Sequence, residues 1–268
     1  VDGRYTVQVR SQVASDLFEY LHLADAPQAD WLAMVLPAGS TVACDPRLHS
    51  LQWYEDTKNT LALAGVELVI DADNLIDRCW LDRPQPVCNR AILLDESFTG
   101  ESSADKRQRI ALQIAAQGCD AALIFSPDSV SWLLNIRGTD MPQLPVVQSF
   151  AILEASAKMT LFIDARRLPQ GFQQHVGDGV IVLEETAAGG AFADYAKHKI
   201  LADAKNAGAW VQMELVRNGA TLVHGEDPVL LPKACKNPTE LNGSRSAHCR
   251  DAVAEIRFLA WLDGEVAA

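Results

Sequence analysis

The segment Ser131–Glu154 constrains the fold of this chain more than any other, because three kinds of local structure follow one another within it. Its apolar start, Trp132–Leu134, is typical of the end of a short amphipathic helix. Pro142 and Pro145 then favour an extended backbone and exclude a helix. The apolar run Phe150–Leu153 predicts a strand that is buried on both faces. The chain must therefore turn between a buried helix and a buried strand.

The turn between this helix and this strand is polar. It spans Asn135–Asp140, and Gly138 within it can take backbone angles that other residues avoid. Arg137 and Asp140 are close enough in sequence to pair across the turn. Two hypotheses follow from the residue types alone. The two side chains form a local ion pair that fixes the turn, or they are presented to another domain or to a ligand.

Strands and helices alternate along the first part of the chain. Strands are indicated by alternating or continuous apolar residues, and helices by longer amphipathic runs that end at Gly or Pro. This alternation predicts an α/β fold in which helices pack on a sheet. The predicted strands are Tyr5–Val9, Leu17–Leu23, Thr41–Cys44 and Val66–Ile70, and the predicted helices are Pro27–Leu36, Leu48–Ala64 and Asp73–Trp80, the last capped by Asp71 or Asp73.

A proline-containing segment, Leu81–Asp95, is the best candidate for a linker. A second α/β region follows it, in which Phe150–Leu153 and Leu161–Ile163 are expected to form an antiparallel hairpin. The other elements predicted after the linker are a helix over Ala104–Gln117 that is capped by Ser102 or Ser103 and ended by Gly118, strands at Ala121–Phe125 and Val180–Leu183, a helix at Ala191–Lys205, strands at Trp210–Leu215 and Ala220–Val223, a connector at Pro228–Pro238, and an amphipathic helix from Pro238 to about Gly264.

Charge and hydropathy exclude several classes of partner. The 268 residues carry a formal net charge of −12, which argues against binding to nucleic acid or to an anionic membrane. No run approaches the roughly 18 apolar residues of a membrane-spanning helix, and the N-terminus lacks the basic start and apolar stretch of a signal peptide. We therefore expect a cytoplasmic protein whose six scattered cysteines are free thiols.

No catalytic or metal-binding motif stands out in the sequence. The GxSxG, HExxH and GxxxxGK[ST] motifs are absent. His248 and Asp251 lie three residues apart on a predicted helix, but no further ligands accompany them, so a surface pair is expected. Asp71, Asp73 and Asp77 lack the central Gly and the closing Glu of a calcium loop and are expected to serve as caps and surface charge. We therefore predict neither a metal site nor catalytic residues in this chain.

Several motifs occur in the same order as in a known family. Trp132–Asp140 (WLLNIRGTD) precedes Pro-Val and an apolar strand, and this pattern resembles the middle domain of the Xaa-Pro aminopeptidases (aminopeptidase P) of the creatinase/prolidase superfamily. Asp2–Tyr5 (DGRY) and Gly39–Val42 resemble segments of that family's first domain. Asp82–Pro84 resembles the exit from that domain, and Leu231–Asp251 resembles the passage into the catalytic domain. The resemblance covers essentially the whole chain.

The resemblance implies a fold and a domain organisation. The fold would be α/β, with two creatinase-N-terminal-like (ribonuclease H-like) domains built on mixed sheets. Residues 1–88 would be an incomplete first domain, residues 89–232 a second domain, and residues 233–268 a linker and the first helix of the catalytic domain. Residues 184–209 match the family only in spacing. Family strands expected before Val1 are missing, so we expect an open sheet edge and a chain that is poorly soluble or oligomerises.

In the family this chain resembles, catalysis belongs to a C-terminal pita-bread domain. Two Asp, one His and two Glu hold two metal ions there, usually manganese, and none of these ligands can be matched in this sequence. The resemblance therefore implies the non-catalytic N-terminal part of a metal-dependent Xaa-Pro aminopeptidase, inactive alone, which shapes substrate access and supports a homodimer. Substrates of the complete enzyme would be short peptides with proline in the second position.

Three residues are candidates for functional contacts. Arg4 matches a position whose arginine, in the larger aminopeptidase P enzymes, reaches the peptide-binding site, and a guanidinium suits a substrate carboxylate or carbonyl. The alternative is that Arg4 only pairs with Asp2. For Arg137 and Asp140 we expect docking against the catalytic domain. Two other functions stay open: a catalytically silent, creatinase-like module that binds peptides or proteins, and a creatinase or prolidase that acts on another small amide.

Overall fold

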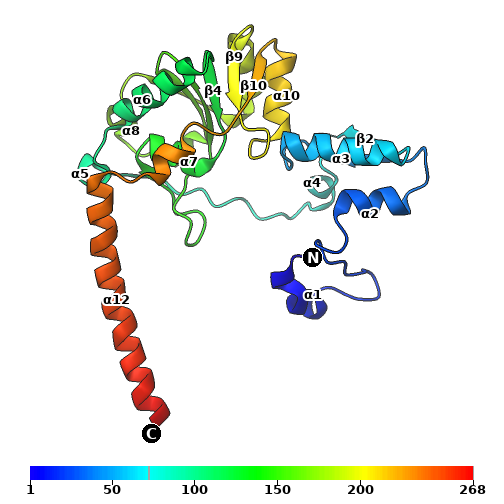
Figure 1. The fold of residues 1–268 in the computed structure, drawn as a ribbon, viewed down its shortest axis with the longest axis horizontal. Helices are drawn as coiled ribbons and strands as arrows, with labels where there is room; N and C mark the ends of the chain where they lie inside the picture. The colour runs from blue at the N-terminus through cyan, green and yellow to red at the C-terminus, as the bar shows by residue number, and fades with distance from the viewer. Residues whose placement is uncertain (72, 268) are drawn as a thin grey trace. The chain divides into compact units, whose positions relative to one another are not determined.

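The chain folds into two units. The computed structural model describes residues 1–71 and 73–267. The first unit comprises residues 1–84 together with 208–211, and the second comprises residues 85–207 together with the chain from 212 onward. Both units combine helices with strands (Figure 1), so the α/β class predicted from the sequence is confirmed.

The first unit is built around one short parallel strand pair. β1 (Thr41–Cys44) pairs in parallel with β2 (Glu67–Ile70), and α3 (Leu51–Leu63) connects them, as a parallel pair requires. The core of this unit is small, and α2 (Gln28–Val35) contributes partly buried side chains to it. Its buried apolar members are Cys44, Leu61, Val66 and Leu68.

Two strands predicted near the N-terminus are wrong. Residues 3–12 form a 3-10 turn, Gly3–Tyr5, followed by the helix α1 (Thr6–Gln12). Asp2 accepts a hydrogen bond from the backbone N–H of Arg4, and this cap starts helical geometry. Leu17–Leu23 contains no strand, and Leu17 is exposed. An alternating pattern specifies a strand only where a sheet edge receives it. Among the residues that the structure describes, β1 and β2 pair only with each other.

The cap predicted for the last helix of the first unit is also wrong. α4 spans Leu75–Cys79, and its N-cap is Asn74, which accepts from the backbone N–H groups of Ile76 and Asp77. Asp71 and Asp73 instead lie in the turn before it, where the Asp73 N–H donates to Asp71 at 2.9 Å. Asn and Asp are equally good caps, so composition alone did not choose between the neighbouring candidates.

A mixed six-stranded sheet forms the centre of the second unit. Its strand order is β10-β9-β4-β6-β7-β8. β4 and β6 are antiparallel, as are β6 and β7, whereas the remaining neighbours are parallel. The predicted antiparallel hairpin is therefore confirmed as β6 and β7. The strands are β4 (Ala121–Ile124), β6 (Phe150–Glu154), β7 (Met159–Phe162), β8 (Val180–Leu183), β9 (Lys199–Ala202) and β10 (Thr221–His224).

Helices surround this sheet (Figure 1). The longest helix before β4 is α6 (Ser103–Ala116); Ser102 caps it, and Gly118 follows it at a φ of 70°, as predicted. A separate strand pair, β3 (Ile92–Leu93) with β5 (Ile136–Arg137), is antiparallel. The other helices are α5 (Glu96–Thr99), α7 (Pro127–Leu133), α8 (Phe172–Val176), α9 (Ala188–Ala191), α10 (Ala209–Arg217), α11 (Leu230–Ala234) and α12 (Pro238–Ala267).

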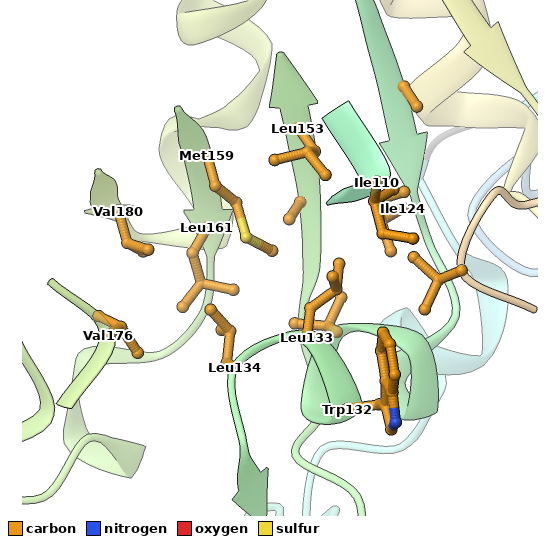
Figure 2. Close-up of a cluster of buried hydrophobic side chains, with 14 of the residues drawn as sticks. Ile110, Ile124, Trp132, Leu133, Leu134, Leu153, Met159, Leu161, Val176 and Val180 are labelled. Carbon is orange, nitrogen blue, oxygen red and sulfur yellow. The ribbon is translucent and has the colours of Figure 1, made fainter. Parts of the chain in front are cut away.

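The hydrophobic core of the second unit lies between the sheet and the helices. Figure 2 shows Ile110 of α6, Ile124 of β4, Leu133 of α7, Leu153 of β6 and Leu161 of β7 pointing into one cluster. All five are at or near complete burial. Because fully burying such a side chain contributes about 1.5–3 kcal/mol, this cluster provides a rigid support for the loops that leave it.

Two elements predicted for the second half are wrong. The helix expected at 191–205 is a 3-10 turn, Phe192–Tyr195, followed by the strand β9. Lys197 lies between them at a φ of 67°, which ends helical geometry. The strand expected at 210–215 is the helix α10. β9 and β10 are parallel neighbours, and a parallel connection needs a crossover element, usually a helix. No helix in the described part of the chain combines the length and the apolar character that crossing a membrane requires.

Candidate functional site: the arginine corner

The polar turn predicted from the sequence, Asn135–Asp140, is a rigid corner in the second unit. β5 begins it by pairing with β3, so that Arg137 lies opposite Ile92. Ser131 accepts a hydrogen bond of 3.0 Å from the backbone N–H of Val147, which ties the far side of the loop to α7. We call residues 135–147 the arginine corner. Backbone pairing at one end and a side-chain bond at the other hold it against the core.

Asn135 enters the corner in the left-handed region, at a φ of 53°. Its buried side chain accepts from the Lys106 ammonium at 2.8 Å and donates to the Glu101 carbonyl at 2.8 Å. The ring nitrogen Nε2 of His175 lies 3.0 Å from the Leu134 carbonyl and 3.2 Å from the Asn135 carbonyl. Asn tolerates this backbone conformation better than most residues. Local strain is therefore offset by bonds from three separate elements.

Gly138 is required for a reason other than the one predicted. It is not among the glycines with a positive φ. Instead, a Cβ at this position would lie 2.0 Å from the carbonyl oxygen of Val146. Glycine is therefore needed because one backbone segment packs directly on another.

Of the two hypotheses for Arg137 and Asp140, the local ion pair does not form. Arg137 is partly buried, and its Nη1 donates to the adjacent Ile136 carbonyl at 2.8 Å. Burial lowers the pKa of Arg137 from its ordinary value, and the carboxylate of Glu240 opposes that shift. The guanidinium has five donors, so its bonding capacity exceeds the one contact to its own neighbour.

Asp140 pairs with a residue far along the chain. Its carboxylate forms an ion pair with Arg167, and both side chains are only 7% exposed. Asp140 also accepts from the backbone N–H of Asn89 at 2.7 Å, while Arg167 donates to the Val87 carbonyl at 3.2 Å. The pair therefore fastens the middle of the linker, residues 87–89, to the corner. Sequence proximity pointed to Arg137 because the true partner is distant in sequence.

Two important residues were missed from the sequence, Arg167 and Lys106. Arg166 and Arg167 are adjacent in the 3-10 turn after β7, and no local pattern shows that the first is exposed and the second buried. Lys106 did carry one, because it precedes Ile110 and Ile114 at four-residue steps on α6 and therefore lies on the buried face of that helix. A charged residue at such a position predicts a buried partner.

Arg4, the predicted substrate-binding residue, lies in the first unit. Its Nε donates to Asp2 Oδ1 at 3.0 Å, and its Nη2 donates to Asp2 Oδ2 at 3.1 Å. The guanidinium and the carboxylate therefore form a bidentate pair. The guanidinium carbon lies 5.6 Å from the ring centre of Tyr5. Its side chain is 79% exposed. Arg4 is thus accessible and also makes the local pair considered as the alternative.

No metal centre is formed by the residues that the structure describes. Within 1–71 and 73–267, no three His, Cys, Asp or Glu side chains are grouped so that they could hold an ion. His248 and Asp251 are both exposed on α12. Asp77 bonds Arg83, and Asp73 lies 3.6 Å from Arg78. The donor set of the described residues therefore does not fit a dinuclear metal site.

Comparison with known proteins gives one consistent assignment. The family model "Creatinase/Prolidase N-terminal domain" matches residues 82–240, more than half of the chain. Xaa-Pro aminopeptidase 1 of Dictyostelium discoideum is 31% identical over 277 residues, which cover 99% of this chain and 44% of that protein. Xaa-Pro aminopeptidase ApepP of Drosophila melanogaster is 28% identical, with 99% and 44% covered.

A solved structure matches along the same length. The X-prolyl aminopeptidase of Caenorhabditis elegans, described as a cytosolic enzyme with a di-nuclear active site, superposes with a TM-score of 0.89 at 27% identity. The match covers 99% of this chain and 44% of that one. The chain therefore spans less than half the length of the relatives it resembles.

Proposed function

Because this chain belongs to the creatinase/prolidase N-terminal domain family, we propose that it is the non-catalytic N-terminal part of a metal-dependent Xaa-Pro aminopeptidase. The observation that carries this proposal is the end-to-end likeness to enzymes of that name, in sequence and in backbone structure. A family domain shared by several activities would match only one unit. Here the match extends through both units and into α12.

The proposal assigns a role to each part of the chain. Residues 1–88 and 89–232 are two creatinase-like domains that border the substrate path, and residues 233–268 lead into the catalytic domain. α12 is then the first helix of that domain. Its exposed apolar side chains support this assignment, because a helix in water alone does not normally leave so many uncovered. They include Val253, Ile256, Phe258, Leu259 and Trp261.

The metal chemistry belongs to residues outside this chain. Two manganese ions, held by two Asp, one His and two Glu, would activate a water and polarise the peptide carbonyl before proline. The nematode relative's di-nuclear site supports two ions, and manganese is our proposal. Since the described residues offer no such ligand set, the chain itself is proposed to bind, exclude and orient rather than to carry out a chemical step.

The candidate residues take distinct roles in this proposal. Arg137 and Asp140 belong to a surface that docks on the catalytic domain: the pair with Arg167 fixes the corner, and Arg137 keeps unused donors. Arg4 is proposed to contact the peptide, for which its exposure supplies access. The complete enzyme would act in the cytoplasm as a homodimer on short peptides with proline in second position. The description of the nematode relative as a cytosolic enzyme supports the proposed cytoplasmic location.

A complementation experiment tests the proposed function. The 268-residue chain is assayed with an Arg-Pro-Pro peptide and manganese, alone and mixed with a separately expressed polypeptide encoded downstream of Ala268. We expect no cleavage by the chain alone and cleavage by the mixture. The downstream sequence is expected to contain the two Asp, the His and the two Glu.

Two outcomes would reject the proposal. Cleavage by the purified chain alone would contradict its non-catalytic role. A downstream sequence without the five ligands would favour the alternative of a silent peptide- or protein-binding module. An inactive variant of the downstream part, with one ligand Asp replaced by Asn, controls for contaminating peptidases.

A further inference from the structure

A buried lysine lies beside the arginine corner. Lys106 is 1% exposed. Its Nζ donates to the Asn135 side chain at 2.8 Å and to the Trp132 carbonyl at 3.2 Å, and it lies 4.0 Å from the centre of the Trp132 ring. No carboxylate of the described residues lies within ion-pair distance of it. The ammonium is therefore held by neutral dipoles and by the face of one aromatic ring.

The same tryptophan reaches the start of α12. Trp132 Nε1 donates to Glu240 Oε1 at 3.3 Å. The other oxygen of Glu240 accepts from the Asn237 N–H at 3.0 Å, while the Glu240 N–H donates to the Asn237 side chain at 2.9 Å. This reciprocal pair is a capping box. Asn237 also donates to the Thr99 carbonyl at 2.7 Å, which joins the first turn of α12 to α5.

Trp132 thus lies between one buried positive charge and one carboxylate that caps a helix. The other charges that face Lys106 come from different elements: Glu101 before α6, Arg109 on α6 and Arg137 on β5. Arg109 is itself paired with Glu101 at 2.8 Å. His175 of α8 bonds the far side of the same turn, at the Asn135 carbonyl. Arg109 also lies 5.6 Å from the centre of the Trp132 ring, and both Arg109 and Arg137 interact with Glu240. Removing the charge of Lys106 therefore weakens the attraction on Glu240 without abolishing it.

We propose that Lys106, Trp132 and Glu240 form a charge-controlled clamp that holds the first turn of α12 against α7, and that loss of the Lys106 proton loosens this turn. The clamp is a property of this chain. Its consequence, control over how firmly the catalytic domain is attached, rests on the proposed function.

Lys106 can lose its proton at a pH at which the chain stays folded. Burial lowers the pKa of Lys106 to about 8, with Glu240 and Glu101 acting in the opposite direction and Arg137 and Arg109 adding to the decrease. Below that pH the ammonium attracts Glu240 and rests on the Trp132 ring. Above it, the neutral amine keeps its hydrogen bonds but loses both electrostatic interactions. The first turn of α12 is then held by its capping box, by the Trp132 bond to Glu240 and by the bond to Thr99, without the attraction of the ammonium.

Hydrogen exchange in the full chain tests the clamp. Quench-flow exchange with mass spectrometry is run between pH 6 and 10, and protection factors, corrected for intrinsic exchange, are taken for residues 237–243. We expect protection to fall about tenfold across a midpoint near the Lys106 pKa. A ¹⁹F label on the Trp132 indole follows ionisation of Lys106 in parallel.

Three variants separate a charge effect from a packing effect. K106M keeps the length of the side chain without charge, and it should show low protection at every pH. E240Q preserves the capping box but removes the charge that raises the Lys106 pKa, so the midpoint should move to lower pH. K236M alters an exposed lysine beside the cap and should behave as the unmodified chain.

The proposal is overturned if protection in the unmodified chain does not vary with pH, or if K106M retains the transition. A midpoint that E240Q leaves in place would also overturn it. None of these readouts uses peptidase activity, so failure of the clamp is distinguishable from failure of the proposed function.

Discussion

Two arginine–aspartate pairs, one in each unit, share their chemistry and differ in their surroundings. Asp2 and Arg4 are neighbours in the sequence, and their side chains are 42% and 79% exposed. Asp140 and Arg167 come from distant parts of the chain and are each 7% exposed. The first pair caps one turn. The second joins the linker, the arginine corner and the 3-10 turn that follows β7.

The difference shows that the contribution of an ion pair to stability cannot be judged until its burial is known. An exposed pair gains modest Coulomb energy and is screened by salt, so it contributes about 0–1 kcal/mol. A buried pair adds little net stability against an apolar replacement, but losing one partner leaves an uncompensated charge. The exposed pair leaves Arg4 free to exchange partners, whereas the buried pair makes Asp140 and Arg167 parts of a fixed support.

The substitution Arg167→Met tests the difference between the two pairs most directly. We expect the free energy of unfolding of the second unit to fall by about 3–5 kcal/mol, because Asp140 is left buried and unpaired. Arg166→Met is the matched control, since its side chain is 79% exposed in its pair with Asp164, and it should cost less than about 1 kcal/mol. Opening free energies from hydrogen exchange of β7 measure both.

The double variant Asp140→Asn with Arg167→Met sharpens the same test. Removing both charges should recover part of the loss, because neither partner then stays charged and unpaired. Equal effects of Arg166→Met and Arg167→Met would contradict the difference that burial makes.

The second prediction concerns pH and Lys106. Its pKa is lowered to about 8 in the fold, below its ordinary value, so between the two values the unfolded chain binds more protons. The unfolding free energy of the core therefore rises with pH in this window. Once Lys106 is fully deprotonated in both states, a pKa decrease of this size adds on the order of 3 kcal/mol to the unfolding free energy. Urea unfolding at pH 7 and pH 10 should show the gain in the unmodified chain and not in Lys106→Met.

The elements that were predicted correctly from the sequence are those whose structure is determined by neighbouring residues. The strands β4, β6, β7 and β8 were predicted because each is a short apolar run. The first three are paired on both sides, whereas β8 is an edge strand. α6 was predicted because Ser102 and Gly118 mark its ends locally. The antiparallel class of the β6–β7 hairpin followed from its short connection. Each of these features is written in a few adjacent residues.

The errors arose where a distant partner decided the outcome. Residues 210–215 alternate like a strand, but β9 and β10 are parallel and require the helix α10 between them. The hypothesis of an Arg137–Asp140 pair rested on proximity, whereas folding brings Arg167 to that carboxylate. The Lys106 site was missed although its spacing from Ile110 indicated burial, because Asn135 and Trp132 meet it only in the folded chain.

Backbone packing in the corner supplies the third prediction. Gly138→Ala should destabilise the second unit by about 1–3 kcal/mol, because the new methyl group collides with the Val146 carbonyl and the corner must shift. Gly243→Ala is the matched control on α12, where a Cβ meets nothing within 4 Å, and alanine should instead stabilise the helix by about 0.5–1 kcal/mol. Thermal unfolding of both variants measures the opposite signs, and a neutral Gly138→Ala would show that the corner is pliable.

The smallest effect on stability is expected at the exposed pair. Arg4→Ala should change the unfolding free energy by less than about 0.5 kcal/mol, since the guanidinium is accessible and its pair with Asp2 is screened. Arg10→Ala, another exposed arginine nearby, is the control. In the complemented enzyme the two variants should diverge: Arg4→Ala raises KM for an Arg-Pro-Pro peptide, and Arg10→Ala does not. If both leave the kinetics unchanged, Arg4 has no role beyond its turn, and the exposed pair is as purely structural as the buried one.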